Sequence, residues 1–276
     1  MTTLSPEQSR RIHPTAVVSP EAELGPGVEI GPYSIIGEAV HIGAGTVIGP
    51  HVLIEGRTSI GEECWINVGA VIGSPPQDDK YHGEPTEVII GNRTHIREYV
   101  TIHRATGEGK ATRVGSNCRI MAYSHLAHNC EVGNGVSIAN YGGMSGHTVI
   151  EDGAVIGGMV GSHQFVRVGR LAMVSGFSKI SVDIPPFALA DGKPARVISL
   201  NVRGLRRAGM DTEVRARLAK AFKVLYRSGL NLSNALEQLA GEPDDSPEVG
   251  YLISFLEKVQ KGFAGRANDP QGKRDE

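Results

Sequence analysis

The sequence is poor in aromatic residues and in cysteine. Aromatic side chains make up 5% of the 276 residues, and the three cysteines are Cys64, Cys118 and Cys130. Because three is an odd number and no CxxC pair occurs, we expect neither a disulfide framework nor a thiolate zinc site, and a reducing cytoplasm fits. With so few aromatic residues, a core must be built from small aliphatic side chains.

Long apolar runs and a strong net charge are also missing. No stretch of about 18 apolar residues occurs, and the first residues lack the apolar segment of a signal peptide. The 28 Lys and Arg residues against 30 Asp and Glu residues give a net charge of −2. This balance provides no basic field for nucleic acid or for an anionic membrane. We therefore expect a cytoplasmic protein that neither spans a membrane nor binds nucleic acid.

What the sequence does contain is a six-residue repeat. An apolar residue stands at every sixth position from 12 to 72, from 90 to 102 and from 114 to 180, with Ser162 as the one exception. Glycine directly follows this position in twelve of the 26 hexads, where we expect it to turn a corner in a conformation closed to other residues. A period of six fits neither a helix nor a simple strand, so the repeat predicts a solenoid.

The repeat resembles that of the hexapeptide-repeat acyltransferases, in which three hexads form one coil of a triangular prism. The resemblance implies a left-handed parallel β-helix over residues 12–190, after an N-terminal extension at 1–11, with loop insertions at 74–88 and 104–113. After Pro185 and Pro186 the rhythm stops and helical patterns follow. We expect a small helical domain at 191–264 and a disordered tail at 265–276, so the fold class is mainly β with an α-helical C-terminal part.

Counting in laps of 18 residues places side chains above one another on neighbouring coils. One lap from His128 reaches Gly146, and two laps reach the position after His163, so His147 and His163 lie within one residue of the same column. Closely spaced imidazoles repel one another when all are charged. We therefore expect some of them to be neutral near pH 7 and able to accept a proton.

Two chemistries compete for this histidine column. The gamma-class carbonic anhydrases share the prism and hold zinc with neutral imidazole nitrogens. In the other chemistry, one histidine deprotonates a sugar hydroxyl that attacks a thioester, while a backbone N–H stabilises the oxyanion. A third alternative is a non-catalytic scaffold, in which the repeat serves structure alone.

Motifs around the column resemble the family of UDP-N-acetylglucosamine O-acyltransferases that begin lipid A biosynthesis. They are SHLAHNC from Ser124, GH at Gly146, HQF at His163, TIHR at Thr101, and QDDKY with GEPT in the first insertion. The resemblance implies an acyltransferase that moves a 3-hydroxyacyl chain from acyl carrier protein to the 3-position of UDP-N-acetylglucosamine. It also implies a homotrimer that needs no cofactor and no metal. An acceptor sugar with a 3-amino group in place of the 3-hydroxyl stays open.

The same resemblance assigns roles to individual residues. His128 corresponds to the general base, Gly146 to the residue whose N–H faces the oxyanion, and Gly176 to the position that limits acyl length. The residues that correspond to substrate contacts are Asp78, Lys80, His125, His147, His163, Gln164, Asn201, Arg206 and Arg207.

Three positions depart from the family pattern. Asn129 follows the base where many members have Asp, so a neutral amide would orient the imidazole. Arg203 stands where an acidic contact with uridine is common, and Ala208 replaces a further arginine. A basic cluster could receive the acidic carrier protein, and it comprises Arg203, Arg206, Arg207, Lys220 and Lys223.

Overall fold

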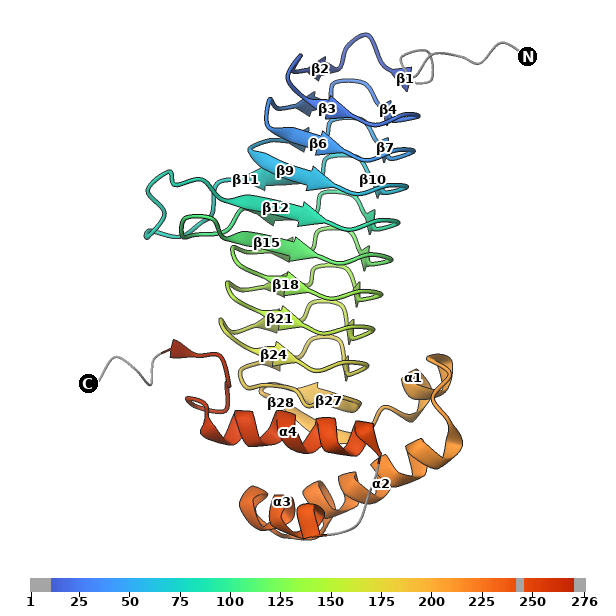
Figure 1. The fold of residues 1–276 in the computed structure, drawn as a ribbon, viewed down its shortest axis with the longest axis vertical. Helices are drawn as coiled ribbons and strands as arrows, with labels where there is room; N and C mark the ends of the chain where they lie inside the picture. Colours follow the sequence, from blue (N-terminus) through green and yellow to red (C-terminus); the bar gives the residue numbers. More distant parts are fainter. Residues whose placement is uncertain (1–10, 242–245, 271–276) are drawn as a thin grey trace.

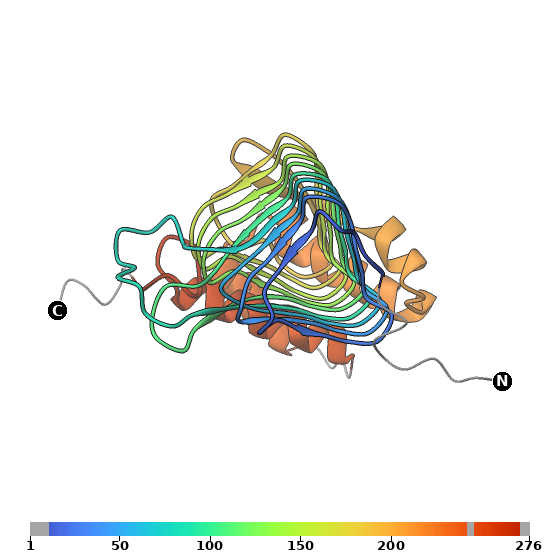
Figure 2. The same ribbon diagram turned by 90° about the horizontal axis from the view of Figure 1, so that it is seen from above.

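The computed structural model describes residues 11–241 and 246–270. Stacked coils form a tall prism, and helices pack beneath its last coil (Figure 1). Seen along its axis, the prism has a triangular cross-section with one parallel sheet on each side (Figure 2). It is a left-handed parallel β-helix, so the solenoid predicted from the six-residue repeat and the fold implied by the family resemblance are confirmed.

Each side of the prism is a ladder of short strands. The eleven-stranded sheet contains β1 (Arg11–Ile12), β4 (Glu29–Ile30), β7 (Val47–Ile48), β10 (Trp65–Ile66), β13 (His95–Ile96), β16 (Arg119–Ile120), β19 (Ser137–Ile138), β22 (Val155–Ile156), β25 (Met173–Val174), β27 (Ala188–Gly192) and β28 (Ala195–Leu200). The nine-stranded sheet contains β2 (Val17–Val18), β5 (Ile35–Ile36), β8 (Leu53–Ile54), β11 (Val71–Ser74), β14 (Thr101–His103), β17 (His125–Leu126), β20 (Gly143–Met144), β23 (Gly161–Ser162) and β26 (Lys179–Ile180). The eight-stranded sheet contains β3 (Glu23–Leu24), β6 (Val40–Ile42), β9 (Arg57–Ile60), β12 (Glu87–Ile90), β15 (Ala111–Val114), β18 (Glu131–Val132), β21 (Val149–Ile150) and β24 (Arg167–Val168).

Strand register shows where extra residues interrupt the coils. His125 pairs with Gly143 one regular lap later, whereas Thr101 pairs with Val71 on one side and with His125 on the other. The extra residues leave the prism as two loops, at 75–86 between β11 and β12 and at 104–110 between β14 and β15. The predicted insertions at 74–88 and 104–113 were too long at their ends, because those end residues pair in β11, β12 and β15.

The interior of the prism is filled by one apolar residue from each hexad. Ile54 and Ile72, for example, have no exposed surface. Burying such a side chain is worth roughly 1.5–3 kcal/mol, so the stacked rungs stabilise the prism along its whole length. Ser162 occupies an interior position with its polar group hydrogen-bonded, because its hydroxyl accepts the Ser145 N–H and bonds to the Thr148 hydroxyl.

The predicted role of the hexad glycines is wrong for eleven of the twelve, and Gly73 alone among them has a positive φ, at 87°. Gly43 does not have a positive φ, but a Cβ there would lie 2.6 Å from the carbonyl carbon of Gly61 on the next coil. These glycines are needed because adjacent coils approach closely. Left-handed backbone conformations fall mostly at other corner positions, which hold either glycine, such as Gly135 with φ 65°, or residues with side chains, such as Tyr123 with φ 61° and His147 with φ 60°.

The prism ends in a hairpin before the helices begin. β27 extends the eleven-stranded sheet and pairs antiparallel with β28. The helices that follow are α1 (Val202–Arg207), α2 (Thr212–Arg227), α3 (Leu232–Gly241) and α4 (Pro247–Lys261). The predicted helical domain from 191 is therefore wrong for residues 191–200, because the free edge of the sheet pairs with this segment. No helix among the described residues combines the length and the hydropathy needed to cross a membrane.

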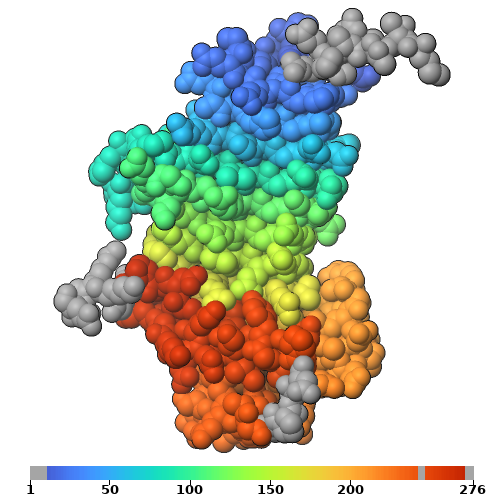
Figure 3. Space-filling view, in the orientation of Figure 1, coloured from blue at the N-terminus to red at the C-terminus, as the bar shows by residue number. Residues whose placement is uncertain are grey.

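The predicted disordered tail is also wrong for residues 265–270. Arg266 is 8% exposed, and its guanidinium donates to the Ser181 carbonyl and to Asp269. The Ala267 N–H donates to the buried Asp183 carboxylate. This segment therefore lies against the last coils of the prism (Figure 3). Residues 1–10 of the predicted extension and 271–276 of the predicted tail lie outside the described residues.

Candidate active site

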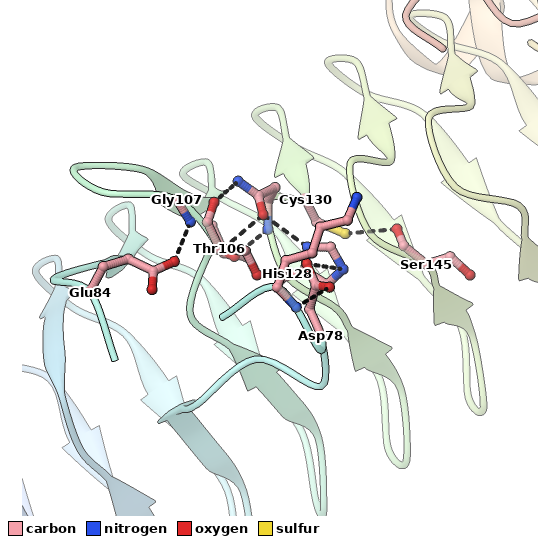
Figure 4. Close-up of polar contacts among 10 residues, drawn as sticks. Asp78, Glu84, Thr106, Gly107, His128, Cys130 and Ser145 are labelled. Carbon is pink, nitrogen blue, oxygen red and sulfur yellow. Dashed lines mark hydrogen bonds and ion pairs between the residues drawn. The ribbon is translucent and has the colours of Figure 1, made fainter. Parts of the chain in front are cut away.

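The histidine column lies on one corner of the prism, between the nine-stranded and the eight-stranded sheets. We call it the histidine corner, and it comprises residues 127–130, 145–148 and 163–166. The two inserted loops leave the prism at the same corner on the preceding coils. The repeat therefore places the loops directly beside the imidazoles (Figure 4).

His128 is held in one orientation by Asn129. The His128 side chain is 8% exposed, and its Nδ1 lies 2.9 Å from Asn129 Oδ1. The same Oδ1 accepts the Thr106 N–H, and Asn129 Nδ2 donates to the Thr106 carbonyl. Because the amide nitrogen is committed to Thr106, Oδ1 must accept from His128, so Nδ1 carries the proton. His128 Nε2 is left with a lone pair, which a general base requires.

The first loop brings Asp78 to the free nitrogen of His128. Asp78 Oδ2 lies 3.8 Å from His128 Nε2, and Asp78 Oδ1 accepts the Lys80 N–H at 3.1 Å. Burial acts to raise the pKa of Asp78, but the Lys80 hydrogen bond and the attraction to Lys80 and to the protonated form of His128 outweigh it, so the pKa lies below its usual value. The carboxylate is therefore charged beside the imidazole near neutral pH.

Glu84 ties the two loops together. Its Oε1 accepts the Gly107 N–H at 2.7 Å and its Oε2 accepts the His82 N–H at 2.8 Å, and the contact with Gly107 is visible in Figure 4. These hydrogen bonds lower the pKa of Glu84. Glu84 and Asn129 together anchor loop 104–110 at the adjacent residues Gly107 and Thr106.

Neutral imidazoles surround His128. The His147 ring stands edge-on to it, with centroids 5.3 Å apart, and Thr101 Oγ1 bonds His125 Nδ1 at 2.7 Å. Burial, reinforced by repulsion from the protonated form of His128, lowers the pKa of His147 to about 4. Burial, together with His103 and His128, lowers the pKa of His125 to about 4 as well. This agrees with the expectation that part of the column is neutral.

His103 belongs to this cluster although the sequence assigned it no role. Its ring stands edge-on to His125, with centroids 5.2 Å apart, and its buried Nδ1 has no partner among the described residues. Burial lowers the pKa of His103 as well. The inserted loop hid this residue from the lap count. Thr101 pairs with His125 although the two are 24 residues apart, so a count of 18 does not bring His103, two residues after Thr101, near His125.

Gly146 lies against the ring of His128. A Cβ at this position would stand 2.4 Å from His128 Nε2, so the corner has room for glycine alone. Gly146 is buried, and no described residue accepts a hydrogen bond from its N–H. An unpaired N–H beside a basic nitrogen is the arrangement that an oxyanion requires.

The structure does not bring every predicted site residue to His128. His163 and Gln164 are exposed, and the His163 ring nitrogen contacts the Gln164 carbonyl. Gly176 lies on a different corner, between the eleven-stranded and the nine-stranded sheets. The roles of these three residues stay predictions.

The predicted nucleotide-binding residues lie on α1, across the prism from the inserted loops. Figures 1 and 2 show α1 and the loops on opposite sides. Asn201 caps α1 by accepting the Gly204 N–H, and its Nδ2 donates to the Leu171 carbonyl, so its amide is already occupied. A cavity of about 570 Å³ beside the helix is lined by Asn201, Arg203 and Arg207, among others. Arg206 and Ala208 are exposed.

A zinc site of the carbonic anhydrase kind requires three ligands in one place. Within residues 11–241 and 246–270, no three His, Cys, Asp or Glu side chains gather in an arrangement that could hold a metal ion. The edge-on packing of His128 and His147 agrees with this, since Nδ1 of His128 is committed to Asn129.

Family models match both parts of the chain. The model described as Udp N-acetylglucosamine O-acyltransferase; Domain 2 matches residues 183–264. The model described as Bacterial transferase hexapeptide (six repeats) matches residues 21–56 and 111–146.

Curated relatives and solved structures agree with these matches. The chain is 48% identical, over 91% of its length and 98% of the relative's, to the acyl-[acyl-carrier-protein]–UDP-N-acetylglucosamine O-acyltransferase of Thermodesulfovibrio yellowstonii. It is 51% identical to the protein of that name from Gloeothece citriformis, over 74% and 73% of the two chains. The solved UDP-N-acetylglucosamine acyltransferase of Francisella novicida superposes with a TM-score of 0.85 at 33% identity, covering 89% of this chain and 91% of that one. The Campylobacter jejuni enzyme gives 0.83 at 38% identity, covering 89% and 96%.

Proposed function

The chain belongs to the family of UDP-N-acetylglucosamine O-acyltransferases, and from this membership we propose how its histidine corner acts. It is an acyltransferase that uses acyl carrier protein and UDP-N-acetylglucosamine in lipid A biosynthesis. The proposed reaction moves a 3-hydroxyacyl chain from the carrier thioester to the 3-position of the sugar. The observation that supports it most directly is a buried imidazole whose Nδ1 bonds Asn129 and whose Nε2 makes no hydrogen bond to a described residue, with Asp78 3.8 Å away.

In the proposed mechanism, His128 acts as the general base. Nε2 takes the proton of the sugar 3-hydroxyl while the oxygen forms a bond to the thioester carbonyl carbon. The Gly146 N–H stabilises the oxyanion of the tetrahedral intermediate. When the C–S bond breaks, the imidazolium returns its proton to the departing thiolate, so the enzyme is regenerated without a cofactor.

Replacing His128 tests this mechanism. Loss of a general base typically costs about 10²–10⁴-fold in rate. The kcat of His128→Ala with 3-hydroxyacyl carrier protein and UDP-N-acetylglucosamine should therefore fall by that factor. His41→Ala is the matched control, because this exposed histidine on β6 bonds Glu23 and lies outside the histidine corner. Near-normal turnover in His128→Ala would refute the assignment.

The separation of α1 from the histidine corner supports a site shared between copies of the chain. The two regions face opposite sides of the prism, so one substrate cannot reach both within one chain. If Arg206 and Arg207 bind the nucleotide while His128 handles the sugar, two copies must contribute. A repeated head-to-tail contact forms a ring when its rotation closes, and we propose that this one closes as a trimer.

An exposed aromatic edge supports the same assembly. It lies on the corner between the eleven-stranded and nine-stranded sheets, and we call it the aromatic corner. Its stacked rings Tyr99, Tyr123 and Tyr141 have centroids 5.1 Å apart, yet each is about half exposed. Met159 and Phe177 continue the stripe. A continuous exposed apolar stripe of this length is typical of a protein interface.

A complementation experiment tests the shared site. Neither His128→Ala nor the Arg206→Ala/Arg207→Ala variant should be active alone, but co-expressed chains should regain part of the wild-type rate. The reason is that mixed trimers contain sites with an intact histidine corner and an intact α1. A monomer by analytical ultracentrifugation, or no recovery in mixed trimers, would contradict the proposal.

We also propose that acyl carrier protein docks on the exposed basic cluster. Opposite charge speeds association with an acidic partner and sets its orientation. The members of the cluster are Arg203, Arg206, Arg207, Lys220 and Lys223, all exposed. Charge reversal at Lys223 should raise KM for the carrier more than KM for the sugar nucleotide, and an unchanged carrier KM would count against this surface.

The acceptor atom and the acyl length need a direct product analysis. Mass spectrometry of a reaction with mixed 3-hydroxyacyl carrier proteins and both the 3-hydroxyl and 3-amino sugar nucleotides identifies reaction, acceptor and length together. We expect an ester at the 3-hydroxyl, with the longest accepted chain shortened by Gly176→Leu. An amide product would replace the acceptor assignment, and unchanged lengths would remove Gly176 from its proposed role.

A further inference from the structure

Asn129 orients His128 but brings it no charge. Its Oδ1 accepts from both His128 and the Thr106 N–H, and its Nδ2 donates to the Thr106 carbonyl. Every polar group of the amide is therefore used. A neutral amide fixes the tautomer of the imidazole, but it stabilises the protonated ring far less than a carboxylate does.

Few charged groups surround His128. His103, His125 and His147 approach it from β14, β17 and the next coil, and burial keeps the pKa of each of these imidazoles low, so all three are neutral at pH 7. Lys80 contributes positive charge from the first loop. Of the described residues, Asp78 alone places a carboxylate within 4.0 Å of the His128 ring.

We propose that Asp78, carried by the inserted loop, supplies the counter-charge for the His128 imidazolium, while Asn129 serves only to position the ring. The idea rests on the proposed function, since the imidazolium forms when His128 takes the substrate proton. Nε2 receives that proton, and Nε2 is the atom that Asp78 faces at 3.8 Å. Side chains of 8% and 18% exposure leave little water to screen the pair.

The hydrogen bonds that hold the first loop in place fit this assignment. Glu84 bonds the first loop to Gly107 of the second, and Asn129 bonds the neighbouring Thr106. The counter-charge is thus tied to the same amide that positions the ring.

The pH dependence of kcat/KM in Asp78→Asn tests the proposal. Removing a negative charge disfavours the imidazolium, so the acid limb should move to lower pH by about one unit, and the plateau should fall because the base is weaker. Asp79→Asn is the matched control, because it removes an exposed carboxylate from the adjacent position. If Asp78 only binds sugar, KM will rise at every pH with the acid limb unmoved, and the proposal fails.

Moving the charge gives a stricter test. Asp78→Asn/Asn129→Asp restores a carboxylate on the other side of the ring, so its acid limb should return toward the wild-type position. The rescue in rate should be partial, because a carboxylate at 129 cannot donate to the Thr106 carbonyl. A double variant whose acid limb matches that of Asp78→Asn would contradict a role for charge.

A measurement without turnover separates this proposal from the proposed function. NMR titration of ¹³Cε1-labelled histidine in the substrate-free protein reports His128 directly, with His128→Ala used to assign its signal. The titration midpoint should fall by about one unit in Asp78→Asn and stay in place in Asp79→Asn. Equal midpoints in Asp78→Asn and wild type overturn the inference, whatever reaction the enzyme performs. Absence of acylated sugar with wild type refutes the function alone.

Discussion

The backbone of Gly146 packs directly against the imidazole ring of His128 on the preceding coil. The hypothetical Cβ at Gly146 lies 2.4 Å from Nε2 and 2.5 Å from Cε1 of His128. The contact follows from the lap count, since the two residues are one lap apart. It makes the proposed oxyanion donor and the proposed base a single rigid unit.

Gly146→Ala should therefore remove activity without unfolding the chain. The added methyl group must push the imidazole off its bond with Asn129, so we expect kcat to fall by about 10²-fold or more. Gly161→Ala is the control, since its Cβ would meet nothing within 4 Å. Thermal unfolding should be similar for both variants. Normal turnover in Gly146→Ala would contradict this, because it would mean that the His128 ring can move aside and still act.

Loosening the loops should affect substrate binding more than chemistry. Glu84→Gln keeps the size of the side chain, but its amide can accept from only one of the two N–H groups that Glu84 now bonds. We expect KM for UDP-N-acetylglucosamine to rise about three- to tenfold with a smaller change in kcat. Glu108→Gln, an exposed carboxylate in the second loop, should leave both constants near wild type. Equal KM and kcat values in the two variants would argue against a role for the Glu84 hydrogen bonds between the loops.

The buried imidazoles should make the protein less stable in acid. The pKa values of His125 and His147 are lowered to about 4 in the folded state, while the unfolded chain keeps the ordinary value of about 6.5. A lowered pKa contributes stability that is complete above pH 6.5 and is lost as pH falls toward 4, because the unfolded chain binds the protons first.

Denaturant unfolding at several pH values measures this effect. Between pH 6.5 and 4, the slope of the unfolding free energy against pH should include up to about two protons from these residues. The His125→Gln/His147→Gln variant should lose most of that part of the slope. A slope equal to that of wild type would place the acid sensitivity elsewhere.

A single interior rung should carry a large share of stability. Ile120 has no exposed surface, so Ile120→Ala leaves a cavity that rigid coils above and below cannot close. We expect the free energy of unfolding to fall by about 2–5 kcal/mol. Arg119→Ala, the exposed neighbour on β16, should change it by less than about 1 kcal/mol. Similar losses in both variants would contradict the core assignment.

The prism and the column of histidines could be predicted from the sequence. An apolar residue at every sixth position indicates one common interior, and the resemblance to the hexapeptide-repeat acyltransferases supplies the lap of three hexads that stacks residues 18 apart. The sequence therefore predicts that His128, Gly146 and His147 lie together. The same dependence on the repeat explains what the sequence does not reveal. The insertion at 104–110 separates His103 from its neighbour His125 in the count, and the hairpin at 188–200 carries no six-residue signal.

How the base is held and which groups face it depend on the tertiary structure. Asn129 could be read as an orienting amide, but its bonds to Thr106 and the approach of Asp78 to Nε2 depend on how two irregular loops fold back on the corner. Such contacts join residues far apart in sequence through side-chain geometry, and no repeat specifies that geometry. The position of α1 across the prism from His128 is a tertiary fact of the same kind, and it is what makes a second copy part of the proposed site.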